Sequence, residues 1–67
     1  MGILKVIELM ASSTKSWEDA AANAVKEATK TLKGVTSVYI KDHSCTVKSG
    51  VINEYRITAK ISFMIEH

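Results

Sequence analysis

Hydrophobic and polar positions divide the chain into segments with different periods. Residues 3–10 (ILKVIELM) are aliphatic apart from two charged positions, which predicts a strand with apolar side chains on both faces. Residues 16–33 repeat apolar side chains every three or four positions, which predicts an amphipathic helix. From residue 35 the period changes to two, weakly through residue 48 and clearly over residues 54–66, which predicts two further strands. The predicted order of elements is β-α-β-β.

The helix carries signals at both ends. Ser16 is a predicted N-cap with the acidic Asp19 three positions later, a short-armed version of the capping box. Lysines occupy the last predicted turn, and Gly34 is placed as the residue that closes the helix. The predicted core-facing positions of the helix are Trp17, Ala21, Ala24, Val25, Ala28 and Leu32. Trp17 is the predicted anchor of the core.

The last two strands form a predicted hairpin around a two-residue turn at residues 49–50. With this turn, the numbers of two paired residues sum to 99. In that register, the alternating patterns of the two strands place their apolar side chains on the same face of the sheet. The predicted pairs are Val38 with Ile61 and Ile40 with Ala59 on the apolar face, and Ser37 with Ser62, Tyr39 with Lys60 and Lys41 with Thr58 on the polar face.

The lengths of the elements predict that the chain does not fold alone. Hairpin arms of about fifteen residues reach roughly 50 Å, whereas a helix of about seventeen residues covers roughly 25 Å. Part of the apolar sheet face therefore has no cover within the chain. A single domain of 67 residues (residues 1–67) also needs added stabilisation, and the one cysteine, Cys45, excludes an internal disulfide. We therefore predict an α+β subunit, with a three-stranded antiparallel sheet packed on one helix, in an obligate homo-oligomer.

Composition narrows the classes of function. The chain is 46% hydrophobic and 24% charged, with a net charge of only +2 spread along its length, which argues against a nucleic-acid partner. No apolar run is long enough to span a membrane, and no signal-peptide pattern opens the sequence. The expected location is cytoplasmic, without a membrane or nucleic-acid partner.

Several strings, in their order and spacing, resemble one family. These are KVIEL at residues 5–9, SW at 16–17, AAANAV at 20–25, KTL at 30–32 and YRITAKISF at 55–63, and they resemble a dodecin. The resemblance implies a β-α-β-β subunit that assembles as a hollow homododecamer of four trimers. It also implies a non-catalytic protein that binds and sequesters flavins (FMN, riboflavin or FAD), with coenzyme A or metal ions as ligands of some members.

The resemblance also implies where a ligand would bind. Ser37 stands where flavin-binding dodecins have a stacking tryptophan, and Arg56 stands where they have a glutamine. A guanidinium donates hydrogen bonds but accepts none, so the predicted site is altered. Ser37 and Arg56 lie about 20 Å apart in the predicted hairpin, so a small ligand that touches both must sit between subunits. The predicted ligand-binding residues are Ser37, Arg56 and Asp42.

Other reactive side chains give weaker indications. His43 and Cys45 share a strand face about 7 Å apart, too far for a nucleophile and its base, and Asp42 points to the opposite face. Symmetry could gather several copies of Asp42, Glu54, Glu66 or His67 around an axis, where a Ca²⁺ or Mg²⁺ ion would bind carboxylate oxygens. Basic residues of the polar face, Lys41, Arg56 and Lys60, are predicted as solvated charges or as a lining for an anionic ligand. We expect Glu8 to pair with a lysine on a neighbouring strand.

We predict a non-catalytic binding and storage shell for a flavin- or nucleotide-like small molecule. The alternative is an ion-binding or purely structural dodecin-like assembly that does not bind flavin. An enzyme at a subunit interface is disfavoured, because the sequence supplies no positioned base and nucleophile.

Overall fold

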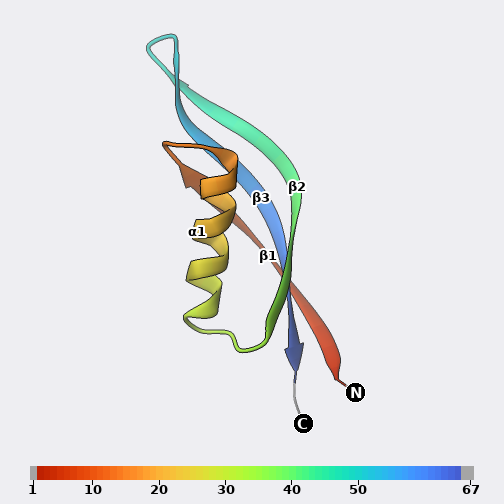
Figure 1. Ribbon diagram of the computed structural model, residues 1–67. Coiled ribbons are helices and arrows are strands. Elements are labelled where there is room, and N and C mark those ends of the chain that lie inside the picture. The colour runs from red at the N-terminus through yellow and green to blue at the C-terminus, as the bar shows by residue number, and fades with distance from the viewer. Residues whose placement is uncertain (1, 66–67) are drawn as a thin grey trace.

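The computed structural model describes residues 2–65 and has the predicted order of elements (Figure 1). These are β1 (Ile3–Ser13), α1 (Trp17–Thr29), β2 (Val35–Lys48) and β3 (Val51–Ile65). The three strands form one antiparallel sheet in the order β1-β3-β2, and α1 packs on one face of it. The predicted α+β class is confirmed; β1 extends three residues beyond its predicted end, and Glu66 and His67 lie outside the described residues.

The start of α1 follows the predicted cap. The Asp19 backbone N–H donates to Ser16 Oγ at 3.0 Å, so the N-cap is confirmed. The Asp19 carboxylate does not complete a capping box and instead accepts from Ser13 Oγ at 2.6 Å. Ser13 Oγ in turn accepts from the backbone N–H of Lys15 at 2.9 Å. This buried serine therefore fastens the end of β1 to the first turn of the helix.

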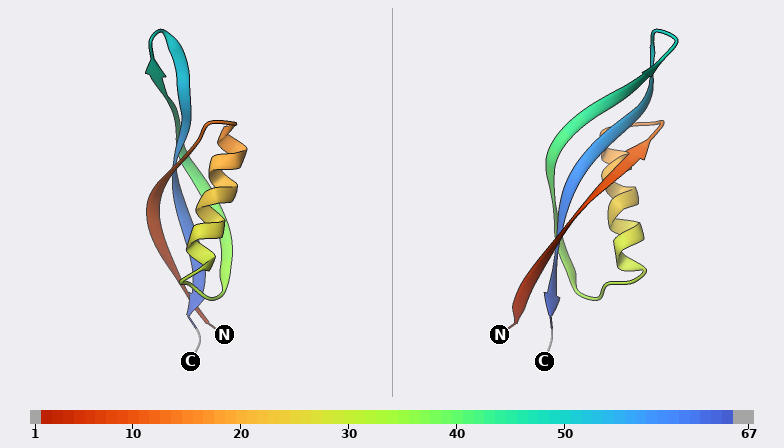
Figure 2. Two further views of the ribbon diagram at one scale, coloured as in Figure 1. Left: turned by 90° about the vertical axis from the view of Figure 1, so that its left-hand side faces the viewer. Right: turned by 180° about the vertical axis from the view of Figure 1, so that it is seen from behind.

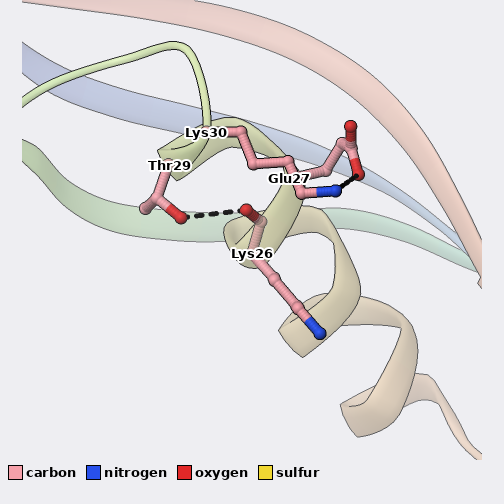
Figure 3. Close-up of polar contacts among 4 residues, drawn as sticks. All are labelled: Lys26, Glu27, Thr29 and Lys30. Atoms are coloured by element: carbon pink, nitrogen blue, oxygen red, sulfur yellow. Dashed lines mark hydrogen bonds and ion pairs between the residues drawn. The ribbon is translucent and has the colours of Figure 1, made fainter.

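The end of α1 differs from the prediction. The helix stops at Thr29, with Lys30 as its C-cap, and Gly34 lies four residues further on in the connection to β2. Thr29 has low helix propensity, and its hydroxyl donates to the Lys26 carbonyl at 2.9 Å (Figure 3). The Lys30 N–H bonds to the Glu27 carbonyl three residues back, which tightens the last turn.

Gly34 has a different structural role from helix capping. Its φ of 72° lies in the left-handed region, and its carbonyl accepts from the backbone N–H of Met64 at 2.9 Å. A Cβ at this position would lie 3.2 Å from the Met64 carbonyl oxygen. Glycine therefore allows the connection to pass directly against β3 before β2 begins.

The core lies between α1 and the middle of β3. Its fully buried sheet residues are Ile57, Ala59 and Ile61, as the alternation along β3 predicts. The buried helix residues are spaced four apart and are Ala20, Ala24 and Ala28. Small side chains at these positions let the helix approach the sheet closely. The prediction of Trp17 as the core anchor is wrong, because Trp17 is 36% exposed at the rim and Ala20 takes the buried place.

The predicted hairpin register is partly confirmed. The turn is at residues 49–50, and the pairs from residue 37 to residue 40 are those predicted. The predicted pair of Lys41 with Thr58 is wrong, because Lys41 is an extra residue in a β-bulge and Asp42 lies opposite Thr58. A further register shift near the turn, between residues 46 and 47, offsets this bulge. Residues 47 and 48 therefore pair with the predicted partners again.

The two irregularities reverse the faces of residues 42–46 of β2. An unbroken register would set Asp42 opposite Ile57, on the face that α1 covers. With the bulge, His43 lies opposite Ile57, and Asp42 turns to the other face. A single extra residue thus decides which side of the sheet carries the carboxylate.

The hairpin extends well past the helix. The molecule measures 51 × 19 × 14 Å, and the turn between β2 and β3 protrudes beyond both α1 and β1 (Figures 1 and 2). The protruding part exposes Val47, Val51 and Ile52, and the sheet face away from α1 exposes Leu4, Val6 and Met10. Within residues 2–65, no helix has the length and apolar character needed to cross a membrane. The predicted mismatch in length between helix and hairpin is confirmed.

Truncation of the core should test this packing. Ile61 is fully buried against Ala24 and Ala28. We expect Ile61→Ala to lower the free energy of unfolding by about 2–5 kcal/mol, through lost burial and the cavity left behind. The matched change Ile61→Val should cost only about 0.5–1.5 kcal/mol. Urea denaturation at one fixed protein concentration measures both, and equal losses for the two variants would contradict this core.

Candidate functional site

The candidate site lies on the sheet face away from α1, which we call the open face. Its β3 residues alternate with the buried ones and are Arg56, Thr58, Lys60 and Ser62. Ser37 lies opposite Ser62, Asp42 opposite Thr58, and Ser44 opposite Arg56. All three predicted ligand residues, Ser37, Asp42 and Arg56, therefore share the open face.

Arg56 lies near the protruding end of this face. It is half-buried between Ser12 of β1 and Ser44 of β2, its two direct cross-strand neighbours. Asp42 is diagonal to it, one strand across and two residues along. Within residues 2–65, ion pairs join only Glu27 to Lys30 and Glu8 to Lys41, so the Arg56 guanidinium has no carboxylate partner there. Its donors remain available for a ligand or a second chain.

Ser37 lies at the other end, in a cluster of hydroxyl groups. Its hydroxyl shares a hydrogen bond with that of Ser62. The Thr36 hydroxyl lies 3.1 Å from the Ser62 hydroxyl and also donates to the Ser62 carbonyl at 3.3 Å. Ser62 and Arg56 are six residues apart on β3, or about 20 Å, so the structure does not bring Ser37 and Arg56 together within one chain.

A charged row crosses the sheet between these two ends. Glu8 of β1, Lys60 of β3 and Tyr39 of β2 lie side by side in the register. Glu8 Oε2 is 3.6 Å from Lys41 Nζ, which confirms that Glu8 pairs with a lysine but not that the lysine lies on a neighbouring strand. Lys41 belongs to β2, beyond the strand that adjoins β1, and it reaches Glu8 from the bulge. Both side chains of the pair are about half exposed, so it stabilises the subunit little.

Two cavities open on the helix side of the sheet. One of about 340 Å³ opens between the start of α1 and β2, and its lining includes Trp17, Glu18 and His43. Another of about 370 Å³ opens between α1 and β1. The residues that line them do not include Ser37, Asp42 or Arg56. Neither of these two cavities therefore holds the predicted ligand residues.

Trp17 forms an aromatic contact at the rim of the first cavity. Its ring centroid is 5.5 Å from that of His43 and 5.1 Å from that of Tyr55, both edge to face. Its indole Nε1 donates to the Ser44 carbonyl at 3.1 Å. Trp17 is thus held to the hairpin and faces away from Ser37, so it does not supply the aromatic surface missing at that position.

Two arrangements of reactive side chains considered from the sequence can be compared with the described residues. His43 and Cys45 share the helix-side face, and His43 contacts Trp17 rather than Cys45. Among residues 2–65, no group of three or more His, Cys, Asp and Glu side chains is close enough to hold a metal. Asp42 and Glu54 share the open face but are about four residues apart in the register, or roughly 13 Å.

These features define a class of small β-α-β-β subunit in which polar side chains gather on an uncovered sheet face. The Dodecin family model matches residues 3–66. The chain belongs to the dodecin family.

Individual relatives agree with this assignment. Calcium dodecin of Mycobacterium tuberculosis is 33% identical over 63 residues, which cover 94% of this chain and 89% of the relative. A crystal structure of that calcium dodecin matches with a TM-score of 0.83 and 34% identity over 96% of this chain and 91% of the other. A variant of T. thermophilus dodecin matches with a TM-score of 0.93 and 25% identity, and each chain is covered completely.

Proposed function

We propose that this chain is a non-catalytic binding subunit that assembles with copies of itself into a hollow dodecamer and stores a flavin- or nucleotide-like small molecule at the seams between them. Family membership supports the binding role. The observation that carries the proposal is the open face, which carries Ser37, Asp42 and Arg56 in the register of the strands. Figure 2 shows that α1 lies on the other side of the sheet, so no helix within residues 2–65 covers this face.

Assembly follows from what this face exposes. Leu4, Val6 and Met10 of β1 are each more than half exposed on it. Apolar surface of this extent favours burial against another subunit. A second copy over the sheet would cover these side chains and bring a second set of ligand residues near the first. The number twelve comes from the family and not from this subunit's surface.

The polar ends of the face support a ligand with hydrogen-bonding groups. The hydroxyl cluster at Ser37 both donates and accepts, and Arg56 adds a permanent positive charge between two serines. A flavin or nucleotide carries a planar ring with polar edges, together with hydroxyl or phosphate groups. Its chemistry therefore matches both kinds of polar group on the face.

The mass of the native particle tests the assembly. We expect sedimentation or native mass spectrometry to give a multiple of 7.3 kDa, with twelve copies as the family number. Val6→Asp should dissociate the particle, because it would place a carboxylate within the exposed apolar surface of the open face. Lys33→Asp, in the connection after α1, is the control and should leave the mass unchanged. A stable folded monomer at nanomolar concentration would reject the assembly.

Flavin fluorescence tests the ligand. We expect micromolar protein to quench the fluorescence of added riboflavin. The double variant Ser37→Trp with Arg56→Gln adds the ring and the amide found at these positions in flavin-binding dodecins. Binding should tighten roughly 2- to 12-fold for each ring that stacks on the flavin.

The control for this titration is Thr14→Trp, which adds an indole before α1 and away from the open face. It should leave riboflavin affinity at the wild-type value. Absence of quenching by both the wild type and the double variant would reject flavin storage. Quenching by the double variant alone would mean that the fold of the site is intact but that flavin is not the ligand of this chain.

Calcium binding is the second candidate function, favoured by the similarity to calcium dodecin. Ca²⁺ takes six to eight oxygen ligands, which the described part of one chain does not gather. Asp42 and Glu54 face the same side of the sheet, so neighbouring copies would have to complete a site around them.

Thermal unfolding with and without calcium tests this candidate. Calcium at about 100 times its Kd would stabilise the folded state by about 2.7 kcal/mol, and a chelator should reverse the rise in Tm. Asp42→Asn should reduce the rise, whereas Glu27→Gln, which changes an exposed helix carboxylate paired with Lys30, should not. An unchanged Tm in calcium would leave the candidate without support.

A further inference from the structure

An exposed aromatic ring lies on the open face close to Ser37. Tyr39 is 63% exposed, which is unusual for a large ring in the middle of a strand. Its cross-strand partner is Lys60, which alternates with the buried Ala59 and Ile61, so the ring stands on the open face. Ser37 is two residues away on the same strand and the same face, about 7 Å along β2.

The surroundings of Tyr39 combine this ring with a positive charge. Lys60 lies directly beside it, and Lys41 follows in the bulge. Lys41 is paired with Glu8, whereas Lys60 has no ion-pair partner within residues 2–65. Glu8 is the other cross-strand neighbour of Lys60, but within residues 2–65 the Glu8 carboxylate forms its ion pair with Lys41. One lysine of this row is therefore available to an anion beside an exposed aromatic face.

We infer that Tyr39 is the stacking platform of the ligand site and that Lys60 binds an anionic group of the same ligand. The ligand class is then a planar aromatic ring that carries a phosphate or carboxylate. This inference rests on the proposed binding function and adds to it the residue that holds the ring. An aromatic surface thus lies one pleat away from Ser37, although the side chain at position 37 itself is a hydroxyl.

The position of Tyr39 fits stacking better than it fits core packing. The buried clusters beneath α1 are formed from the other face of the sheet and do not include Tyr39. Removal of its ring therefore leaves the packing of the subunit intact. A ligand ring that lies flat on the tyrosine would cover its exposed area, and its polar edge would reach the hydroxyl cluster at Ser37.

The test is a fluorescence titration with riboflavin and with FMN, which differ by one phosphate. The variants are Tyr39→Ala, Tyr39→Phe and Lys60→Gln, each compared with the wild type and each checked for native mass. Tyr39→Ala should weaken both flavins roughly 5- to 150-fold, the range for loss of one stacked base. Tyr39→Phe keeps the ring and should stay within about twofold. Lys60→Gln should weaken FMN alone, because riboflavin has no phosphate.

Four other outcomes of this titration would overturn all or part of the inference. Wild-type binding with unchanged affinity in Tyr39→Ala would overturn the platform while the proposed storage function stands. A changed native mass in Tyr39→Ala would also overturn it, because the ring would then be a packing residue between subunits. Equal effects of Lys60→Gln on the two flavins would overturn the anion contact. Failure of the wild type to bind either flavin would overturn this inference together with flavin storage.

Discussion

The structure depends on a mismatch in length between one helix and the hairpin it covers. The 13 residues of α1 span about 20 Å, whereas the molecule is 51 Å long. The helix covers only the central part of one sheet face, through alanines at 20, 24 and 28. Within residues 2–65, the protruding hairpin and the opposite face of the sheet have no helix to cover them. The exposure of polar and apolar groups on that face is a consequence of this incomplete cover, and the proposed assembly and ligand site both rest on it.

The bulge at Lys41 connects the hairpin to the chemistry of the open face. It turns Asp42 away from α1 and turns His43 towards it, where His43 packs against Trp17. Lys41 itself, the extra residue of the bulge, forms an ion pair with Glu8. A strand with one extra residue twists more strongly than a regular one. The bulge therefore decides which side chains of residues 42–46 lie on the open face.

The open face carries both apolar and polar side chains, and they lie on different strands. Its apolar residues lie mainly on β1, where Leu4 and Val6 are exposed, and its polar residues lie mainly on β2 and β3. In the proposed assembly, apolar area on β1 would be buried between subunits, while the hydroxyl and charged groups of β2 and β3 would remain for a ligand. The hydroxyl cluster at Ser37 and the guanidinium of Arg56 lie too far apart for one chain to use both on a small molecule. Binding at a seam between copies removes that difficulty.

The sequence by itself determined the elements, the N-cap at Ser16, the hairpin turn and the buried alternation of β3, because these depend on local propensity and on side-chain period. Only the tertiary structure decided where α1 ends, since Thr29 and the close passage of Gly34 against β3 compete with a longer helix. It also decided the face of Asp42, because a bulge depends on how two whole strands twist against each other and leaves no periodic signal. The sequence pattern already placed Tyr39 on the polar face opposite Lys60, but only the tertiary structure decided that its ring is 63% exposed there, because exposure depends on what the rest of the described chain covers.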